Sequence, residues 1–322
     1  MLLFTSILFA LSAFSLFEIN NKKFDYFLFF FSLIILFLIA AFRTKGYDYE
    51  SYNVIYNTCR NGGLMELDLL FAFICKICPS YRILLFLMAF ISLSCFGKVI
   101  YKWSPMPIMS ILIFYSLLFF SGTMGQMRQN AAIGLVLLAY YYKAEKLKSI
   151  TIFIIAIFLH AAAFLGIIFF IPLKKKLSFG VYSLGIIIAL AFGDILIPQL
   201  NFVISLTGSS FLANKLAFYI ASETMKGISV SFNSAVLIRC IVFSLAYFLI
   251  KNKEPRTIQF INIYYISIIW YLAFGFLPQL GVRGSLYFSV LDIILIPQII
   301  SSQKEITKLI TAIGFIVLSV LR

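Results

Sequence analysis

Long apolar runs constrain this chain more than any other feature of its sequence. The runs from Phe24 to Phe42 and from Ser234 to Ile250 approach or exceed the roughly 18 residues that a membrane-spanning helix needs. Hydrophobic residues make up 62% of the chain and charged residues 12%, with a mean hydropathy of +1.03, which is more apolar surface than one soluble core could bury. Lipid cannot satisfy backbone polar groups, so these runs are predicted to be helices. The predicted fold is all-α, a polytopic transmembrane helix bundle.

Basic residues lie in short clusters between the apolar runs, and these clusters predict the topology. Lys and Arg are kept on the cytoplasmic side of membrane proteins, so each cluster marks an inner loop, and the net charge of +14 does not indicate nucleic-acid binding. The predicted inner loops are Asn20 to Lys23, Lys98 to Pro105, Lys143 to Lys148, Pro172 to Lys176, Lys251 to Arg256 and Ser301 to Lys308. We therefore expect a single integral membrane domain over 1–322, with about ten spans and with outer loops at about 43–68, 198–232 and 275–285.

Two segments do not fit a simple alternation of spans. Leu67 to Cys78 is about half the length that a span needs, and is predicted to dip in from outside or to lie at the interface. Ile150 to Ile171 is long enough for one span, but basic clusters flank both of its ends. We favour a re-entrant pair of half-helices with its apex near His160, because this keeps the later Lys-rich loops inside. A plain span is the alternative, since no Pro or Gly lies at that apex.

Arginines gather at the predicted outer face, whereas the inner loops use Lys almost exclusively. A single Arg there is explained by snorkelling or by salt bridging. Several together favour an anionic ligand, because the planar guanidinium matches phosphate and carboxylate geometry. The arginines concerned are Arg43, Arg60, Arg82, Arg128 and Arg283.

A tyrosine-rich motif follows the first of these arginines. Gly46-Tyr47-Asp48-Tyr49 precedes Tyr52 and Tyr56, and a helix would place Tyr49, Tyr52 and Tyr56 on one face. Aromatic rings beside a carboxylate are typical of sugar sites, because the rings cover the apolar faces of the sugar and the carboxylate binds its hydroxyls. An aromatic belt at the membrane interface is the competing interpretation.

Gly125-Gln126-Met127-Arg128-Gln129-Asn130 is a polar cluster at the outer end of a run that is otherwise rich in Ala and Leu. Helix N-termini attract anions through free N–H groups and the helix dipole, and Arg128 adds a fixed charge. Large polar side chains at membrane depth are costly unless they bind a ligand or one another. This cluster is therefore predicted to bind an anionic substrate.

His160 is the only histidine in the chain, and it lies within an apolar stretch. A lone buried histidine is more often a packing residue than a catalyst, but ionisable groups inside membranes are commonly functional. Imidazole also titrates near neutral pH, as a general base requires. No metal site is predicted, because Cys75 and Cys78 have CxxC spacing but lie in an apolar segment without a nearby histidine.

The order of these motifs resembles a known family. Gly46-Tyr47-Asp48 with Tyr52 is followed by Met127-Arg128-Gln129-Asn130, which opens an Ala-rich run ending in Tyr-Tyr-Lys. Phe158-Leu159-His160 comes next, and then Arg283 before Tyr287-Phe288. In this order the chain resembles the EpsG family, within the wider Wzy-like group of O-antigen and exopolysaccharide polymerases, from about Arg43 to Pro297.

The resemblance implies glycosyl transfer without a cofactor, at the periplasmic face of a bacterial inner membrane. Undecaprenyl-diphosphate-linked repeat units would be donor and acceptor, and a chain-length regulator protein and membrane lipid would be partners. It implies that Arg128 and Arg283 hold the diphosphate and that His160 deprotonates the acceptor hydroxyl, with Asp48 as alternative base or sugar anchor. The further substrate-binding residues would be Arg43, Arg82, Tyr47, Tyr49, Tyr52, Gln126, Gln129 and Asn130.

Two other function classes share some of these features. A membrane-bound O-acyltransferase also has a histidine in a helix, but it takes an acyl donor from the cytoplasm or from a carrier at the membrane. A transporter of lipid-linked glycans shares the arginines, but its polar residues line a path through both leaflets. The polar residues here gather at the outer face, with Arg239 the main exception, and this favours the polymerase.

Overall fold

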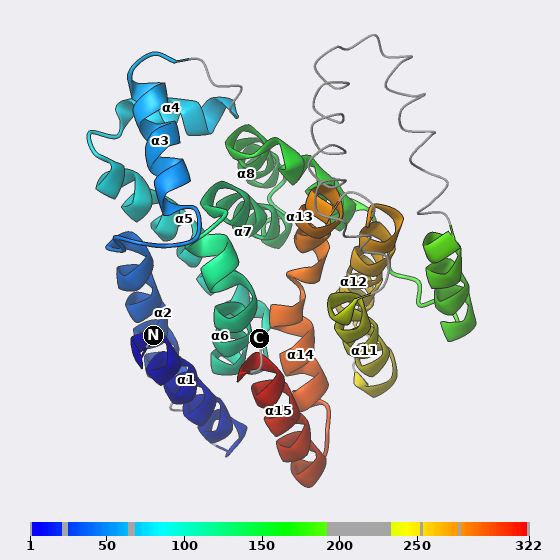
Figure 1. Ribbon diagram of the computed structural model, residues 1–322. Coiled ribbons are helices and arrows are strands. Elements are labelled where there is room, and N and C mark those ends of the chain that lie inside the picture. Colours follow the sequence, from blue (N-terminus) through cyan, green and yellow to red (C-terminus); the bar gives the residue numbers. More distant parts are fainter. Residues whose placement is uncertain are drawn as a thin grey trace, which may run out of the picture. The chain divides into compact units, whose positions relative to one another are not determined.

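The computed structural model describes residues 2–20, 25–63, 68–191, 233–251, 254–275 and 278–320. Within these ranges all regular structure is helical, and no strand occurs (Figure 1). The predicted all-α fold is therefore confirmed for this part of the chain. The expected outer loop at 198–232 lies outside the described residues. Contacts divide the chain into two compact units, Met1–Phe170 with Asp292–Arg322 and Ile171–Leu291, and each is described by itself. The single membrane domain stays a prediction.

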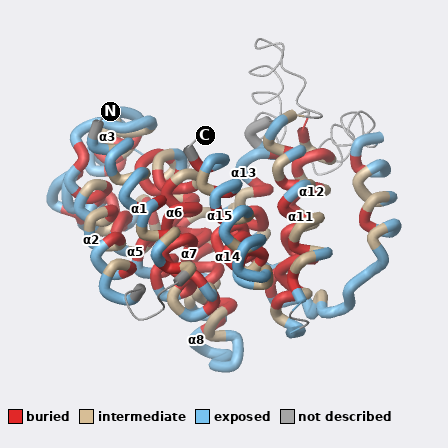
Figure 2. The backbone as a smooth tube through the Cα atoms, turned by 90° about the horizontal axis from the view of Figure 1, so that it is seen from below, coloured by how far each residue is buried: buried red, intermediate tan, exposed pale blue. Residues whose placement is uncertain are grey.

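The core of the first unit is built on three consecutive helical segments. α5 (Tyr81–Trp103) packs along α7 (Met127–Tyr141), and α6 (Pro107–Phe114) is buried at every residue (Figure 2). A Cβ atom added to Gly134 of α7 would lie 3.0 Å from the Cβ of Cys95 in α5, so glycine permits the close approach of these helices. The surrounding helices are α1 (Leu2–Asn20), α2 (Asp25–Ala41), α14 (Asp292–Ser301) and α15 (Glu305–Val320).

A buried carboxylate caps the start of α6. Glu18, 3% exposed, accepts hydrogen bonds from the backbone N–H groups of Ile108 at 2.9 Å and Met109 at 2.8 Å. These N–H groups have no partner within the helix, and a negative charge is favourable at this end of the helix dipole. Glu18 therefore joins α1 to α6. From α6 the chain continues into a π-helical segment, η1 (Tyr115–Thr123), which ends just before α7.

The segment around His160 is a helical hairpin. α8 (Lys146–Leu159) ends at His160, and a 3-10 helix, η2 (Ala161–Phe170), follows directly. The rings of Phe153 in α8 and Phe170 in η2 lie 5.3 Å apart, so the second segment folds back along the first. Each segment is roughly 20 Å long at 1.5 Å per α-helical and 2.0 Å per 3-10 residue. The chain thus reverses direction at His160, where the sequence predicts the apex of a pair of half-helices, and the re-entry of this pair into a membrane stays a prediction.

Two short helices connect α2 to α5. α3 (Tyr49–Arg60) packs against α4 (Leu69–Ile77), and α4 packs against α8. The hydroxyl of Tyr56 donates to the Cys78 carbonyl at 2.8 Å, and Arg60 donates to that hydroxyl at 2.6 Å. The end of α3 is therefore fixed to the end of α4, which is the short segment that the sequence predicts between Leu67 and Cys78.

The second unit contains α11 (Ser234–Leu249), α12 (Pro255–Ala273), α13 (Pro278–Ser289) and a helix at Phe179–Ala191. A polar contact inside it joins three segments. The Asn262 amide of α12 donates to the carbonyls of Leu173 at 2.8 Å and Lys175 at 3.0 Å, and its oxygen accepts from the Tyr182 hydroxyl. The basic segment at residues 172–176 is thereby held against α12.

Helix lengths differ from the topology expected from sequence. Among the described residues, one helix, Tyr81–Trp103, is long and apolar enough to cross a membrane, or two if a bent pair of helices counts as one span. The sequence-based expectation of about ten spans, which was made from the apolar runs, is therefore not confirmed. The physical reason is that several runs form shorter helices, such as Pro107–Thr123 and Ser234–Leu249, or break in the middle, as at His160.

Candidate active site

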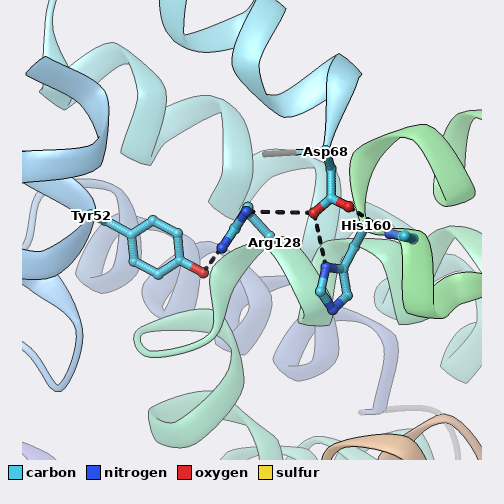
Figure 3. A network of polar contacts seen from close by, with 5 residues as sticks. Tyr52, Asp68, Arg128 and His160 are labelled. Atoms are coloured by element: carbon cyan, nitrogen blue, oxygen red, sulfur yellow. Dashed lines mark hydrogen bonds and ion pairs between the residues drawn. The ribbon is translucent and has the colours of Figure 1, made fainter. Parts of the chain in front are cut away.

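Three helix ends meet in the first unit and bring four polar side chains together (Figure 3). Asp68 is the N-cap residue of α4, Arg128 is in the first turn of α7, and His160 is the C-cap residue of α8. Tyr52 reaches the group from α3. Helix ends carry backbone groups without intrahelical partners and a partial charge, so they can hold ionised side chains in fixed positions.

Asp68 is the centre of the group. Its Oδ2 lies 3.1 Å from His160 Nδ1, and its Oδ1 accepts a hydrogen bond from the Ala161 backbone N–H at 2.8 Å. Burial raises the pKa of this carboxyl, but the hydrogen bonds from His160 and Ala161 and the charges of His160 and Arg128 outweigh it, so that the pKa lies below its ordinary value. Asp68 is therefore an anion, and it binds two adjacent residues, His160 and Ala161, at the apex of the α8/η2 hairpin.

This carboxylate fixes the tautomer of His160. An ionised carboxylate only accepts hydrogen bonds, so Nδ1 of the imidazole must carry the proton that it donates to Asp68. Nε2 then has a lone pair, and no hydrogen bond joins it to any residue in the described part of the chain. The His160 side chain is 24% exposed. Its backbone is extended, with φ −156° and ψ 113°, which turns it away from the α8 axis. A neutral imidazole in this setting can accept a proton at Nε2.

Arg128 lies on the other side of the carboxylate. Its guanidinium is 3.4 Å from Asp68 Oδ2, and its Nε donates to the Tyr52 hydroxyl at 3.5 Å. The guanidinium also lies over the rings of Tyr52 at 5.6 Å and Phe71 at 5.0 Å. The side chain is 20% exposed. These contacts hold a cation at the start of α7, where it can bind an anionic group.

The tyrosine-rich motif contributes one residue to this cluster. Tyr52 is buried beside Arg128, whereas Tyr47 is 92% exposed. The Tyr49 ring packs edge-to-face on Tyr81 at 5.1 Å. Asp48 precedes α3, and its side chain makes no capping hydrogen bond. Of this motif the structure therefore joins only Tyr52 to His160 and Arg128, through Asp68.

The other predicted arginines occupy different environments. Arg43, 7% exposed, donates a hydrogen bond to the Met124 carbonyl and contacts the Met127 sulfur at 3.9 Å. It thus fixes the turn that leads into α7. Arg82 is exposed in the first turn of α5. Arg283 is exposed in α13, in the second unit.

The polar residues around Arg128 differ in burial. Gln126 is half-buried just before α7, and Gln129 is 4% exposed. Asn130 is 1% exposed, and its amide donates to Ser92 at 2.9 Å and to Thr123 at 2.8 Å. In this arrangement Asn130 joins α7 to α5 and η1, so its amide hydrogens are used within the protein and not for a substrate.

Sequence reasoning missed Asp68 as a site residue and noted it only as the end of an outer loop. A signal was present, because Asp68 is a carboxylate between Leu67 and Leu69, directly before an apolar segment too short to span a membrane. For metals, no group of three or more His, Cys, Asp or Glu side chains in the described ranges lies close enough together to hold an ion.

Comparisons with known proteins bear on the family alone. No curated protein and no solved structure shows significant similarity to the chain. The sequence profile of the EpsG family matches residues 26–321, which is nearly the whole chain, and includes all four residues of the cluster. The chain therefore belongs to the EpsG family, a family of membrane proteins associated with polysaccharide polymerisation.

Proposed function

We propose that this protein polymerises undecaprenyl-diphosphate-linked oligosaccharide repeat units into O-antigen or a related surface polysaccharide, at the periplasmic face of a bacterial inner membrane. Tyr52, Asp68, Arg128 and His160 form the proposed active site. One observation carries this proposal: Asp68 binds His160 Nδ1 and leaves Nε2 with a free lone pair, in the same cluster as a fixed guanidinium. A base and a cation together are what transfer from a sugar diphosphate needs.

The reaction joins an acceptor hydroxyl to the anomeric carbon of the donor. Nε2 of His160 takes the hydroxyl proton while the acceptor oxygen forms its bond to that carbon. The bond between the carbon and the phosphate oxygen breaks, and its electron pair leaves on the diphosphate. Asp68 holds the imidazole in position and stabilises the imidazolium that forms, as an orienting carboxylate does in hydrolytic triads.

Arg128 supports the leaving group in this proposal. Negative charge develops on the diphosphate as the bond breaks, and a guanidinium that is already in place stabilises it without reorganisation. The resemblance adds Arg283 as a further ligand of the anionic part of the substrate. Tyr47, Tyr49, Arg82, Gln126 and Gln129 stay in the proposal as substrate-binding residues. Arg43 and Asn130 support the site by holding the start of α7 in place. The chain-length regulator stays in the proposal as a protein partner.

The test is an assay with purified protein and lipid-linked repeat units. The proposal expects glycans of increasing length, resolved as a ladder by gel electrophoresis or mass spectrometry. An esterified sugar without elongation would indicate an acyltransferase instead. Uptake of the lipid-linked glycan into vesicles, again without elongation, would indicate a transporter. Either of these results contradicts the proposal.

Substitution of Arg128 tests whether the planar pair of donors of its guanidinium is needed for the reaction. Arg128→Lys keeps the positive charge but loses the planar pair of donors, and we expect the polymerisation rate to fall by about 10²-fold. Arg256→Lys, at a half-buried arginine 3.6 Å from Glu254 in the second unit, is the matched control and should retain the wild-type rate. If Arg128→Lys also retained that rate, the geometry of the guanidinium would have no role in the reaction.

A further inference from the structure

A groove with a volume of about 540 Å³ lies between α2 and α5 of the first unit, away from the proposed active site. Its walls are apolar along most of their length, and the rings of Phe30 and Phe90 are exposed. Gly97 lies in the floor, where a Cβ atom would come within 2.7 Å of Leu33. The groove therefore depends on the missing side chain, and its size is in the range of small-molecule sites. The main apolar lining residues are Phe30, Leu33, Ile34, Phe37, Phe90 and Leu93.

One end of the groove is polar and positively charged. Lys98 and Tyr101 line this end, and the Lys102 ammonium lies 5.1 Å from the centre of the Tyr101 ring. No acidic residue is among those that line the groove. Phe37 and Phe90 line the opposite, apolar end, and their rings lie 6.3 Å apart. An occupant that matches this pattern has one apolar chain and one anionic head.

The length of the groove selects among such molecules. The stretch of α5 from Phe90 to Tyr101 rises roughly 16 Å at 1.5 Å per residue. This is about half of the roughly 30 Å hydrocarbon core of a membrane, which is the depth of one leaflet. Among the described residues α5 is also long and apolar enough to cross a membrane by itself, and with Phe30 and Phe90 exposed we infer that this surface faces lipid. One acyl chain fits this length, whereas a long polyprenyl chain exceeds it.

We propose that the groove binds one acyl chain of an anionic phospholipid, with its phosphate at Lys98 and Tyr101. The ammonium of Lys98 and the hydroxyl of Tyr101 supply the donors for the phosphate oxygens. The sequence assigns Lys98 to the cytoplasmic side, where anionic lipids attract basic residues. This lipid site goes beyond the proposed reaction, and it does not require that the protein be a polymerase.

The test measures which lipid the protein retains. Purified protein in detergent is offered equal amounts of phosphatidylglycerol and phosphatidylcholine, and bound lipids are counted by native mass spectrometry. The wild-type protein should retain phosphatidylglycerol in preference to phosphatidylcholine. Lys98→Gln should lower this retention by about five-fold, which corresponds to the roughly 1 kcal/mol that one Lys contributes at an anionic surface.

Two further variants separate groove binding from general charge. Ser94→Phe places a ring in the groove from an exposed position of α5 and should remove bound phospholipid of either kind. Lys146→Gln removes an exposed lysine at the start of α8, outside the groove, and should leave retention unchanged. Equal retention of phosphatidylglycerol by Lys98→Gln and wild type, or equal losses with Lys146→Gln and Lys98→Gln, would each overturn the proposal.

Discussion

His160→Gln should lower the rate of polymerisation by about two to four orders of magnitude, the usual contribution of a general base. Glutamine has a similar size and can still donate an N–H to Asp68, so the apex of the hairpin should keep its structure. What it cannot do is accept a proton from the acceptor hydroxyl. The measurement is the initial rate of glycan elongation by purified variants, with circular dichroism as the check on folding.

A second substitution separates His160 from the other candidate base. Asp48→Asn tests the alternative base, and we expect a much smaller effect because, in the described residues, Asp48 meets the cluster only through its backbone carbonyl, which accepts from the Tyr52 N–H, and its side chain makes no capping hydrogen bond. If His160→Gln matched wild type in rate, Asp48 would become the leading candidate.

The hairpin at His160 was predictable because two independent features of the sequence agree on it. Ile150 to Ile171 is apolar throughout, and basic residues flank both ends. A single span would place Lys174 to Lys176 outside, which the distribution of Lys in membrane proteins disfavours. The length of each half could not be predicted, since no Pro or Gly marks the break and the second half is a 3-10 helix rather than an α-helix.

The arginines show what the sequence alone could not resolve. Arg43 and Arg128 both lie at the predicted outer face, but Arg43 binds the backbone carbonyl of Met124, whereas Arg128 meets a carboxylate. The difference depends on which partner the fold brings near, and that partner is far away in sequence. Asp68 escaped notice for the same reason, because its contacts with Arg128 and His160 join residues separated by 60 and 92 positions.

Asp68→Asn should reduce the rate by about 10³-fold to 10⁴-fold, the order of loss when the orienting carboxylate of a hydrolytic triad is replaced by an amide. The Ala161 N–H needs a hydrogen-bond acceptor, so the amide oxygen of the substituted side chain is expected to occupy the position of Oδ1. The NH₂ group then faces His160 Nδ1 and the Arg128 guanidinium in place of Oδ2. This NH₂ group can only donate hydrogen bonds, and its contacts with the Nδ1–H donor and with the guanidinium cation are both unfavourable. The imidazole should therefore shift its proton from Nδ1 to Nε2, so that Nδ1 can accept from the NH₂ group.

Glu50→Gln is the matched control for this change, because Glu50 is an exposed carboxylate in the first turn of α3 with no contact to the cluster. Its rate should equal that of wild type. A loss of the same size in both variants would indicate a general effect of charge and would remove Asp68 from the mechanism.

The position of the proton can be observed directly, because the chain has one histidine and selective ¹⁵N-histidine labelling therefore gives one imidazole signal pair. In its neutral form the wild-type imidazole should show a protonated Nδ1 and an unprotonated Nε2, since Asp68 accepts from Nδ1. Asp68→Asn should reverse this pattern. A rate that falls while Nδ1 keeps its proton would mean that Asp68 supports the fold around the hairpin but does not set the tautomer of the base.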